Sequence, residues 1–517
     1  MDYPENIARM VKDARELRKL LLSDPWRPAY HFAFPEDDGR PGDPNGAFFA
    51  NGRYHLMFLY NRTGDGFAWG HASSKDLLHW RFHPDAIGPG DGDEGCFSGG
   101  AFVDRDGRAW LSYWGLWGAR GICLASSADE HYDTWTKHPA NPVIAGTDFG
   151  FCETTGKDGK PLAYGTADPS QIWEKDGRYY MLTGNLPLLN KFGRGENPEP
   201  RFTGDHLYLF VSDDLAHWEY LHEFYESKRK WTDASEDDMC PSFLPLPTTP
   251  RGGKPSGSHL LLYISHNKGC QYYIGRYDTK RDRFLPASHG RMTWNDNAYF
   301  APESVVDDKG RHVMWTWIFD DRPEEVWRER GWNGMYGLPR TLWLGEDGAL
   351  RMAPVDELKT LRQRVRGRGA FDVPANGEVD LDKFGKELLE LEVVFKPGKG
   401  RDRYGVKVCR SADGREETVV GYDPAKGALF VDTTKSGLGF GRKIVEEAPL
   451  KLAKGEDLKL RIFVDRGIVE VYANDRQAIA RAICPTLAGR GIRAFAGKTG
   501  ASVASFRAWE LMPSNPF

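Results

Sequence analysis

Asp43-Pro44-Asn45-Gly46 leads into the apolar run Tyr54-His55-Leu56-Met57-Phe58-Leu59-Tyr60-Asn61. Asp, Pro, Asn and Gly suit any tight turn, so the first four residues alone predict only a turn. The run that follows is rich in aromatic and apolar residues, which is typical of a buried β-strand. A carboxylate on a turn that enters such a strand is held by the backbone and can point into a cavity. Asp43 is therefore a candidate catalytic group.

Short aromatic and β-branched segments recur from about residue 30 to 355, separated by turns such as Asn51-Gly52 and Asp176-Gly177. These turns are typical of β-hairpins. A second element also repeats: residues 74–80 (SKDLLHW) resemble residues 212–218 (SDDLAHW), and residues 129–135 repeat it more weakly. Repeated units of this kind indicate a β-propeller, and about 65 residues for each blade would give five blades.

The remaining segments complete an all-β prediction: a five-bladed β-propeller with a C-terminal β-sandwich and a short N-terminal helix. Residues 5–22 have helical spacing of apolar side chains. We assign residues 1–29 to an N-terminal helical extension and residues 30–355 to the propeller catalytic domain. The Arg-rich residues 356–369 are expected to be a linker, partly helical, and residues 370–517 a sandwich.

Composition excludes several classes of partner. The 517 residues carry a formal net charge of -5 without a basic stripe, which argues against binding nucleic acid or an anionic membrane. The seven cysteines are scattered and lack metal-binding spacing, so no metal or other cofactor and no disulfide scaffold is expected. No signal peptide is visible, so we expect a cytoplasmic protein, or a secreted one if a leader has been removed.

Further motifs follow the first block in a fixed order. They are Cys96-Phe97-Ser98-Gly99, Ala167-Asp168-Pro169, Met239-Cys240-Pro241, Tyr299-Phe300-Ala301-Pro302-Glu303-Ser304, Gly337-Leu338-Pro339-Arg340, and Phe463-Val464-Asp465-Arg466 with Val469-Glu470-Val471-Tyr472-Ala473-Asn474. In this order, they resemble the motifs of glycoside hydrolase family 32, the group of invertases, inulinases and levanases. The resemblance covers nearly the whole chain from His31 onward.

The resemblance implies a five-bladed propeller with a central funnel, and retaining hydrolysis or transfer of a β-fructofuranosyl unit. Such chemistry needs an ionised nucleophilic carboxylate and a protonated acid/base about 5–5.5 Å apart. Asp43 matches the position of the family's nucleophile, and Asp168 that of its transition-state stabiliser. The implied substrate is a small carbohydrate.

The chain departs from the family pattern at its acid/base, because Met239 stands where the family has Glu. Ala167 also replaces the Arg of Arg-Asp-Pro. Three carboxylates directly precede Met239. We favour Asp238 as the relocated acid, because a β-bulge would turn it inward, with Glu236 or Asp237 as the next candidates. Glu303, on an apolar strand, is a further candidate, since a buried Glu needs a partner or a function.

Six other residues are candidates for lining the funnel and binding substrate: Asn45, Trp69, Phe97, Ser98, His266 and Trp317. Several functions stay open at this point. The main expectation is a retaining glycosidase that acts on a β-fructofuranoside or a related furanoside. The alternatives are an intramolecular fructotransferase that forms or cleaves difructose anhydrides, a non-catalytic carbohydrate-binding propeller, and an inverting or phosphorolytic enzyme. Self-association is also left open.

Overall fold

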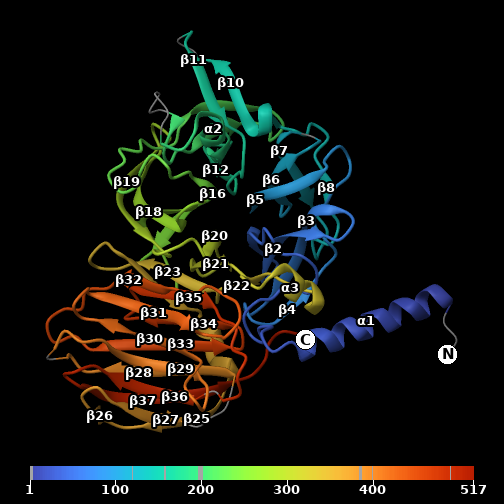
Figure 1. Cartoon of the computed structure of the whole chain (residues 1–517). Coiled ribbons are helices and arrows are strands. Elements are labelled where there is room, and N and C mark those ends of the chain that lie inside the picture. Colours follow the sequence, from blue (N-terminus) through green and yellow to red (C-terminus); the bar gives the residue numbers. More distant parts are fainter. Residues whose placement is uncertain are drawn as a thin grey trace. The chain divides into compact units, whose positions relative to one another are not determined.

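The computed structural model describes residues 4–118, 120–156, 159–195, 202–382, 387–398, 400–489 and 491–516. Strands dominate these residues (Figure 1), so the predicted all-β class is confirmed. The helical elements are short apart from the first: α1 (Glu5–Ser23), α2 (Leu186–Phe192), α3 (Glu324–Arg330) and the 3-10 turns η1 (Asp148–Gly150) and η3 (Asp356–Leu361). Among the described residues, no helix has both the length and the apolar character needed to cross a membrane.

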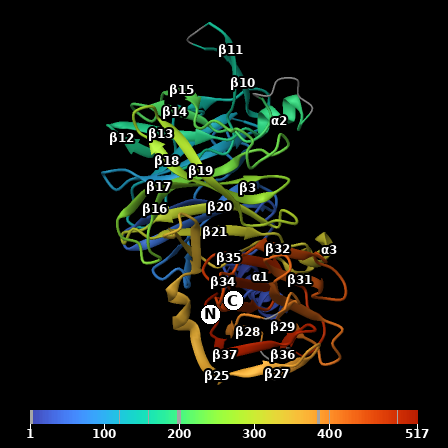
Figure 2. The same ribbon diagram turned by 90° about the vertical axis from the view of Figure 1, so that its left-hand side faces the viewer.

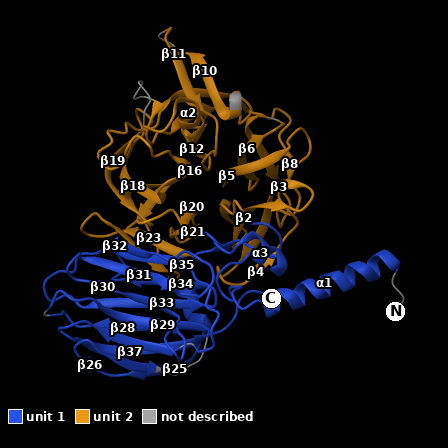
Figure 3. Ribbon diagram, in the orientation of Figure 1, with its two compact units in different colours: residues 1–39, 318–338, 356–517 blue, residues 40–317, 339–355 orange. Residues whose placement is uncertain are grey.

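The chain divides into two compact units, coloured separately in Figure 3. Unit 2 contains residues 40–317 and 339–355, and unit 1 contains residues 1–39, 318–338 and 356–517. The chain therefore passes between the units more than once. The domain boundaries expected from the sequence stay predictions.

Unit 2 is built from successive antiparallel sheets, each formed by strands that are consecutive or nearly consecutive along the chain (Figures 1 and 2). The first sheet is β1 (Pro44–Ala50), β2 (Arg53–Arg62), β3 (Gly66–Ser74) and β4 (Trp80–Phe82). The second is β5 (Gly95–Val103), β6 (Ala109–Leu116), β7 (Gly121–Ser127), β8 (Thr136–Lys137) and β9 (Ile144–Ala145). The two-stranded pair β10 (Phe151–Thr155) and β11 (Pro161–Gly165) follows.

Three more sheets complete unit 2. One is β12 (Trp173–Lys175), β13 (Arg178–Thr183), β14 (Tyr208–Ser212) and β15 (Trp218–Glu223). The next is β16 (Met239–Pro247), β17 (Pro255–Ser265), β18 (Gly269–Asp278) and β19 (Arg283–Arg291). The last follows the order β20 (Tyr299–Val306), β21 (His312–Ile318), β23 (Arg340–Leu344) and β24 (Leu350–Pro354). Strands that begin different sheets pack on one another, since β1 contacts β5 and β20, and β16 contacts β5 and β20.

The repeated sequence element forms the same loop in two of these sheets. Between β3 and β4, Asp76 accepts hydrogen bonds from the backbone N–H groups of Leu78 and His79. Between β14 and β15, Asp214 does the same for Ala216 and His217. A carboxylate that binds the backbone two and three residues on stabilises a tight loop, which explains why the element recurs.

Unit 1 contains two antiparallel sheets. One consists of β25 (Arg362–Arg368), β26 (Phe371–Val373), β28 (Leu388–Phe395), β33 (Leu458–Asp465), β34 (Ile468–Ala473), β35 (Gln477–Ala482) and β37 (Ala501–Leu511). The other consists of β27 (Glu378–Asp382), β29 (Tyr404–Arg410), β30 (Glu417–Asp423), β31 (Ala428–Lys435), β32 (Val445–Pro449) and β36 (Gly491–Ala496). The two-residue strand β22 (Met335–Tyr336) also belongs to unit 1.

The segment 356–369, expected to be a linker, is mostly regular structure: η3 is followed directly by β25, which pairs with β37. The sequence of β25 does not predict a strand, because it is rich in Arg and has no apolar face. Most of its side chains are exposed. Its place in the sheet comes from backbone pairing with β37 rather than from burial.

The N-terminal segment is tied into unit 1 by one buried carboxylate. Asp465, at the end of β33, accepts hydrogen bonds from the backbone N–H groups of Ala29, Tyr30 and His31 and from the His31 ring. Helix α1, which precedes residues 29–31 in the chain, buries Leu21 but leaves Met10 62% exposed. The predicted amphipathic helix is therefore present, and its apolar stripe is covered only near its C-terminal end.

Candidate active site

Asp43 is positioned by the turn that enters β1. The side chain of Asn45 donates to the backbone carbonyl of Asp43 and accepts from the N–H of Gly99 on β5, so the turn is fixed to the neighbouring sheet. Gly46 has a φ of +51°, and a side chain there would press against Trp69 and Leu111. Asn45 is buried, and its side chain is used by these two contacts. It therefore holds the turn, although the sequence suggested that it binds substrate.

Two buried carboxylates meet at one thiol. The Sγ of Cys240 lies 3.6 Å from Oδ2 of Asp43 and 3.4 Å from Oδ2 of Asp168. These two oxygens are therefore at most about 7 Å apart. Ser98, on β5, donates a 2.6 Å hydrogen bond to the same oxygen of Asp43. The other oxygen of Asp43, Oδ1, has no hydrogen-bond partner among the described residues. One buried oxygen of the Asp43 carboxylate is therefore not hydrogen-bonded to the described residues.

The two carboxylates share a perturbed electrostatic environment. Burial raises the pKa of Asp43 above its ordinary value, against the lowering effect of the Ser98 hydrogen bond. Burial and the charge of Asp43 together raise the pKa of Asp168 to about 7. Two neighbouring carboxylates titrate as a coupled pair, because ionisation of one disfavours ionisation of the other. The ionised member is suited to act as a nucleophile.

Cys240 owes its position to an irregularity at the start of β16. The pairing of β16 with β17 shifts register between Met239 and Ser242, and Cys240 has a φ of +49°. Asp168 also lies in the left-handed region, with a φ of +37°. Such conformations cost about 1–3 kcal/mol each and concentrate at functional sites. The bulge that was expected to turn Asp238 inward turns Cys240 toward the carboxylates.

Cys240 was not singled out from the sequence. Burial, with the charges of Asp168 and Asp43, raises the pKa of its thiol well above the ordinary value. The group therefore stays protonated, and its single proton is donated weakly to one of the two carboxylates at a time. Its neighbour Met239 is buried, with its sulfur 3.4 Å from the backbone N–H of Leu186, so it offers no acid at the position where the family has Glu.

Two of the three carboxylates before Met239 are held in ion pairs. Glu236 receives two hydrogen bonds from Arg291 and one from Gln271. Asp237 receives hydrogen bonds from Arg194 and from the ring and backbone of His266. Although burial opposes it, the bond and charge of His266 and the charge of Arg194 lower the pKa of Asp237. The lowered pKa of Asp237 keeps that side chain ionised at neutral pH.

Asp238, the acid favoured from the sequence, lies in a buried network. The hydroxyl of Tyr225 is 2.7 Å from Asp238 and 2.8 Å from Asp205. One hydroxyl has one proton to donate, so the second contact requires a protonated carboxyl group. Burial raises the pKa of Asp238 well above its ordinary value, which identifies it as that group. Its contacts among the described residues do not include Asp43 or Asp168, and its role as acid stays a prediction.

Glu303, the remaining acid candidate, is buried on β20 and accepts a 3.0 Å hydrogen bond from the backbone N–H of Ala47 on β1. Burial raises the pKa of Glu303 well above its ordinary range. A neutral carboxylic acid here joins the first strands of two sheets. This contact gives Glu303 a structural use, and its catalytic role stays a prediction.

The aromatic candidates fall into different environments. Trp69 is fully buried, and its indole N–H donates to the carbonyl of Phe97. Trp317 is also buried and meets Phe300 edge to face. Phe97 is partly exposed and contacts Trp117, which the sequence did not single out and which is 43% exposed. Trp69 and Trp317 therefore serve the core, while Phe97 and Trp117 offer ring surface on which a sugar could stack.

His266 lies between β17 and β18 and keeps part of its ring at the surface. Its side chain is 43% exposed, and its Nδ1 is 2.5 Å from Oδ2 of Asp237. Burial alone would lower the pKa of His266, but the hydrogen bond and charge of Asp237 and the charge of Asp168 raise it. The charge of His266 in turn lowers the pKa values of both Asp43 and Asp168. The imidazolium is thus part of the same electrostatic site.

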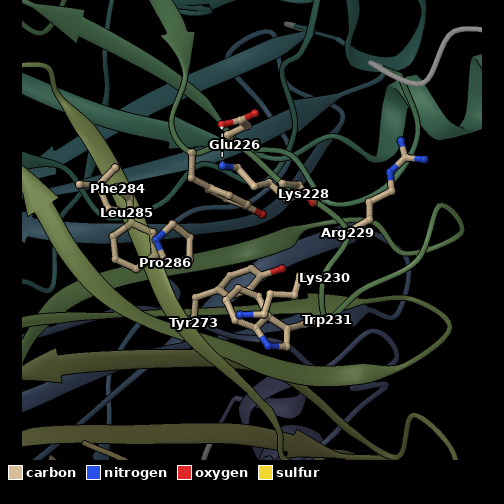
Figure 4. Close-up of a pocket in the computed structure, with 11 residues that line it drawn as sticks. Glu226, Lys228, Arg229, Lys230, Trp231, Tyr273, Phe284, Leu285 and Pro286 are labelled. Carbon is tan, nitrogen blue, oxygen red and sulfur yellow. Dashed lines mark ion pairs between the residues drawn. The ribbon is translucent and has the colours of Figure 1, made fainter.

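Two other features of unit 2 lie apart from these carboxylates. A cavity of about 280 Å³ is lined by residues 225–231, Tyr273 and residues 284–286, with an ion pair between Lys228 and Glu226 (Figure 4). Tyr225 connects this cavity to Asp238. A second cluster, His71, His83 and Asp133, has ligand atoms within 4.8 Å of one another. Both ring nitrogens of His83 are used by Ser73 and Asp133, while Nδ1 of His71 has no hydrogen-bond partner among the described residues.

Comparisons with known proteins cover almost the whole chain. The model of the glycosyl hydrolases family 32 N-terminal domain matches residues 34–354, and that of the family's C-terminal domain matches residues 357–510. A levanase of Bacillus subtilis (strain 168) is 28% identical over 93% of this chain and 69% of its own length. The chain spans half the length of a levanase of Bacillus sp. (strain L7), at 29% identity over 91% of this chain. A sucrose-6-phosphate hydrolase of Klebsiella pneumoniae is 26% identical over 99% of both chains.

Solved structures show the same fold at lower identity. Fructan 1-exohydrolase IIa from Cichorium intybus superposes with a TM-score of 0.79 at 22% identity, covering 95% of this chain and 98% of that one. Exo-inulinase from Aspergillus awamori gives a TM-score of 0.74 at 22% identity, covering 95% of this chain and 99% of that one. With both family models matched in order across the two units, the chain belongs to glycoside hydrolase family 32.

Proposed function

We propose that this protein cleaves β-fructofuranosidic bonds with retention of configuration and that Asp43 is its nucleophile. As a member of family 32, it is a glycosidase of the β-fructofuranosidase type. The observation that carries the mechanism is the convergence of Asp43 and Asp168 on the thiol of Cys240. A buried pair of this kind holds one ionised carboxylate beside one that accepts or shares a proton.

In the proposed reaction, Asp43 attacks the anomeric carbon and forms a covalent glycosyl-enzyme, which water then hydrolyses. Oδ1 of Asp43 is assigned to the attack, because Ser98 and Cys240 both bind Oδ2 while Oδ1 has no hydrogen-bond partner among the described residues. Asp168 would accept hydrogen bonds from sugar hydroxyls and stabilise the positive charge that develops on the ring. Phe97 and Trp117 would provide stacking surface.

We further propose that the five larger sheets of unit 2, leaving out the two-stranded pair β10–β11, are the blades of a five-bladed propeller. Their succession along the chain and the packing of β1 on β5 and β20 support this arrangement. The names of relatives, which include levanase, fructan 6-exohydrolase and sucrose-6-phosphate hydrolase, support a fructan or a sucrose-type sugar as substrate. Transfer to a hydroxyl of the same substrate would use the same first step and differ only in the acceptor. Cytoplasmic location and self-association stay predictions from the sequence.

One observation favours a second candidate function. Met239 is a buried thioether where the family has its acid, so the chain could bind a fructoside without cleaving it. The proposed enzyme requires another group to supply the proton. Turnover decides between the two functions.

The test is product release from sucrose, inulin, levan, inulobiose, difructose anhydrides and β-arabinofuranosides. Wild type is compared with Asp43→Asn and with Asp176→Asn, a matched change in the exposed hairpin turn before β13. We expect product from wild type and Asp176→Asn, and a loss of at least about 10³-fold in Asp43→Asn. Binding by wild type without any product would favour the binding protein. Unchanged turnover in Asp43→Asn would show that Asp43 is not the nucleophile.

A further inference from the structure

The proposed reaction needs a proton donor, and the obvious carboxylates are engaged elsewhere. Glu236 is fixed by Arg291, and Asp237 by Arg194 and His266. Asp238 uses its proton toward Tyr225 in a fully buried network. Glu303 is bound to the backbone of Ala47. A group that gives a proton to a leaving sugar must instead be accessible to it and close to the nucleophile.

His266 meets both conditions. Its side chain is 43% exposed. Its partner Asp237 lies three residues before Cys240, whose thiol contacts both Asp43 and Asp168. Its Nδ1 is held by Asp237, and its Nε2 has no hydrogen-bond partner among the described residues. The ring is fixed by two further contacts, since Asn297 donates to its backbone carbonyl and Phe300 packs against it edge to face.

The pairing with Asp237 gives the ring the character of an acid. Asp237 accepts from both the backbone N–H and the Nδ1–H of His266, which fixes the ring orientation and leaves the proton on Nε2 free to transfer. The charged groups around the ring are Asp237, Arg194, Asp168 and Asp43. Three of these four are acidic, so the imidazolium form is favoured. Arg194 opposes it, but Arg194 is itself bound to Asp237.

We propose that His266, oriented by Asp237, is the general acid/base that replaces the missing Glu at position 239. This inference rests on the proposed function. As Asp43 bonds to the anomeric carbon, the bond from that carbon to the leaving-group oxygen breaks, and the Nε2 proton passes to that oxygen. In the second step, neutral Nε2 takes a proton from water, the water oxygen bonds to the anomeric carbon, and the ester bond to Asp43 breaks. The imidazolium and the Asp43 carboxylate are both restored.

The test compares a substrate whose leaving group needs a proton with one whose leaving group does not. Sucrose, or whichever fructoside wild type cleaves, is compared with β-D-fructofuranosyl fluoride in wild type, His266→Gln and Asp43→Asn. His266→Gln is expected to lower kcat/KM for the fructoside by about 10²–10⁴-fold. It should still release a burst of about one fluoride per enzyme, because forming the glycosyl-enzyme from the fluoride needs no acid. Azide should then restore turnover and give β-fructosyl azide.

A matched control is present in the same unit. His217 forms the same kind of pair with Asp214, Nδ1 to Oδ2 at 2.8 Å, but its side chain is 88% exposed in the repeated loop. His217→Gln should leave both reactions unchanged. Asp237→Asn keeps an acceptor but removes the charge, so the alkaline limb of the pH profile for the fructoside should move down by about 1–2 units. Circular dichroism and thermal unfolding establish that each variant is folded.

The two substrates distinguish loss of the proton donor from loss of the nucleophile. Loss of both reactions in Asp43→Asn, with selective loss of the fructoside in His266→Gln, supports the proposal. Equal loss of both reactions in folded His266→Gln would overturn it, because a structural role would not discriminate between leaving groups. Selective loss in Asp168→Asn and not in His266→Gln would assign the acid to Asp168. Failure of wild type to cleave either substrate would overturn the proposed function and this inference with it.

Discussion

Replacing Ser98 by alanine tests how Asp43 is kept ionised. Ser98 donates a 2.6 Å hydrogen bond to Oδ2 of Asp43, and the pKa of that carboxyl is already raised by burial. A hydrogen bond to a charged group contributes about 1.5–3 kcal/mol, and 1.36 kcal/mol corresponds to one pKa unit. The thiol of Cys240 continues to bind the same oxygen, so the lower end of this range applies. We expect the pKa that governs the nucleophile to rise by about one unit.

The sign of the effect on activity follows from the role of the ionised form. Asp43 attacks only as a carboxylate, so the acidic limb of kcat/KM should move to higher pH in Ser98→Ala, with a smaller change at the plateau. The apparent pKa that sets this acidic limb is a property of the coupled Asp43–Asp168 pair rather than of either residue alone. The assay is the initial rate of fructoside cleavage from pH 4 to 9, at substrate concentrations well below KM.

Ser112→Ala is the matched control. Ser112 is equally buried, but its hydroxyl donates to the backbone carbonyls of Ser170 and Gly100 and not to a carboxylate. The acidic limb of kcat/KM in Ser112→Ala should lie at the same pH as in wild type. An unchanged acidic limb in Ser98→Ala, with a uniform loss of activity at every pH, would show that Ser98 does not keep Asp43 ionised. That result would indicate a direct contact between Ser98 and substrate, as the sequence suggested.

Three further predictions concern single residues. Glu303 is neutral when folded, so its own contribution to stability should fall as pH rises above the ordinary Glu pKa of about 4.5, because the unfolded state releases a proton that the folded state retains. Urea unfolding at pH 4.5 and pH 7 should therefore show Glu303→Gln gaining stability relative to wild type as pH rises, and an unchanged difference would show that Glu303 is ionised. The raised pKa of Cys240 should make it unreactive toward iodoacetamide at pH 8, measured by intact mass, and rapid labelling of Cys240 would contradict this. Asp465→Ala should cost about 3–5 kcal/mol of unfolding free energy, because three backbone N–H groups and His31 lose a buried charged partner; a loss below about 1 kcal/mol would show that water replaces the carboxylate.

The all-β class could be predicted because its signals are local or repeated. Hairpin turns are local signals, and the recurring Asp-centred loop folds in the same way in two of the sheets, at Asp76 and at Asp214. Strand β25 was missed because its pairing with β37 involves backbone groups, while its side chains carry no apolar alternation. Backbone pairing between segments far apart in the chain cannot be predicted from the residues of one segment alone.

The candidate site could be predicted only in part, for a related reason. Asp43 and Asp168 stand out because each lies in a distinctive motif, and the structure brings them together at Cys240. Near Cys240 the pairing of β16 with β17 shifts register, and this shift decides which side chains point toward Asp43 and Asp168. The alternation of polar and apolar residues in the sequence does not predict such a shift. Likewise, the pairing of Asp237 with His266 joins residues from two loops, so neither segment alone indicates a proton donor.

The most direct test of the account is the configuration of the product formed when methanol replaces water as acceptor. Wild type is incubated with its best fructoside in dilute methanol, and the methyl fructofuranosides are identified by NMR, beside Asp43→Asn. The account predicts methyl β-fructofuranoside from wild type and none from Asp43→Asn, since the second displacement restores the original configuration. Formation of the α-anomer, or of the β-anomer by Asp43→Asn, would contradict a retaining mechanism through Asp43.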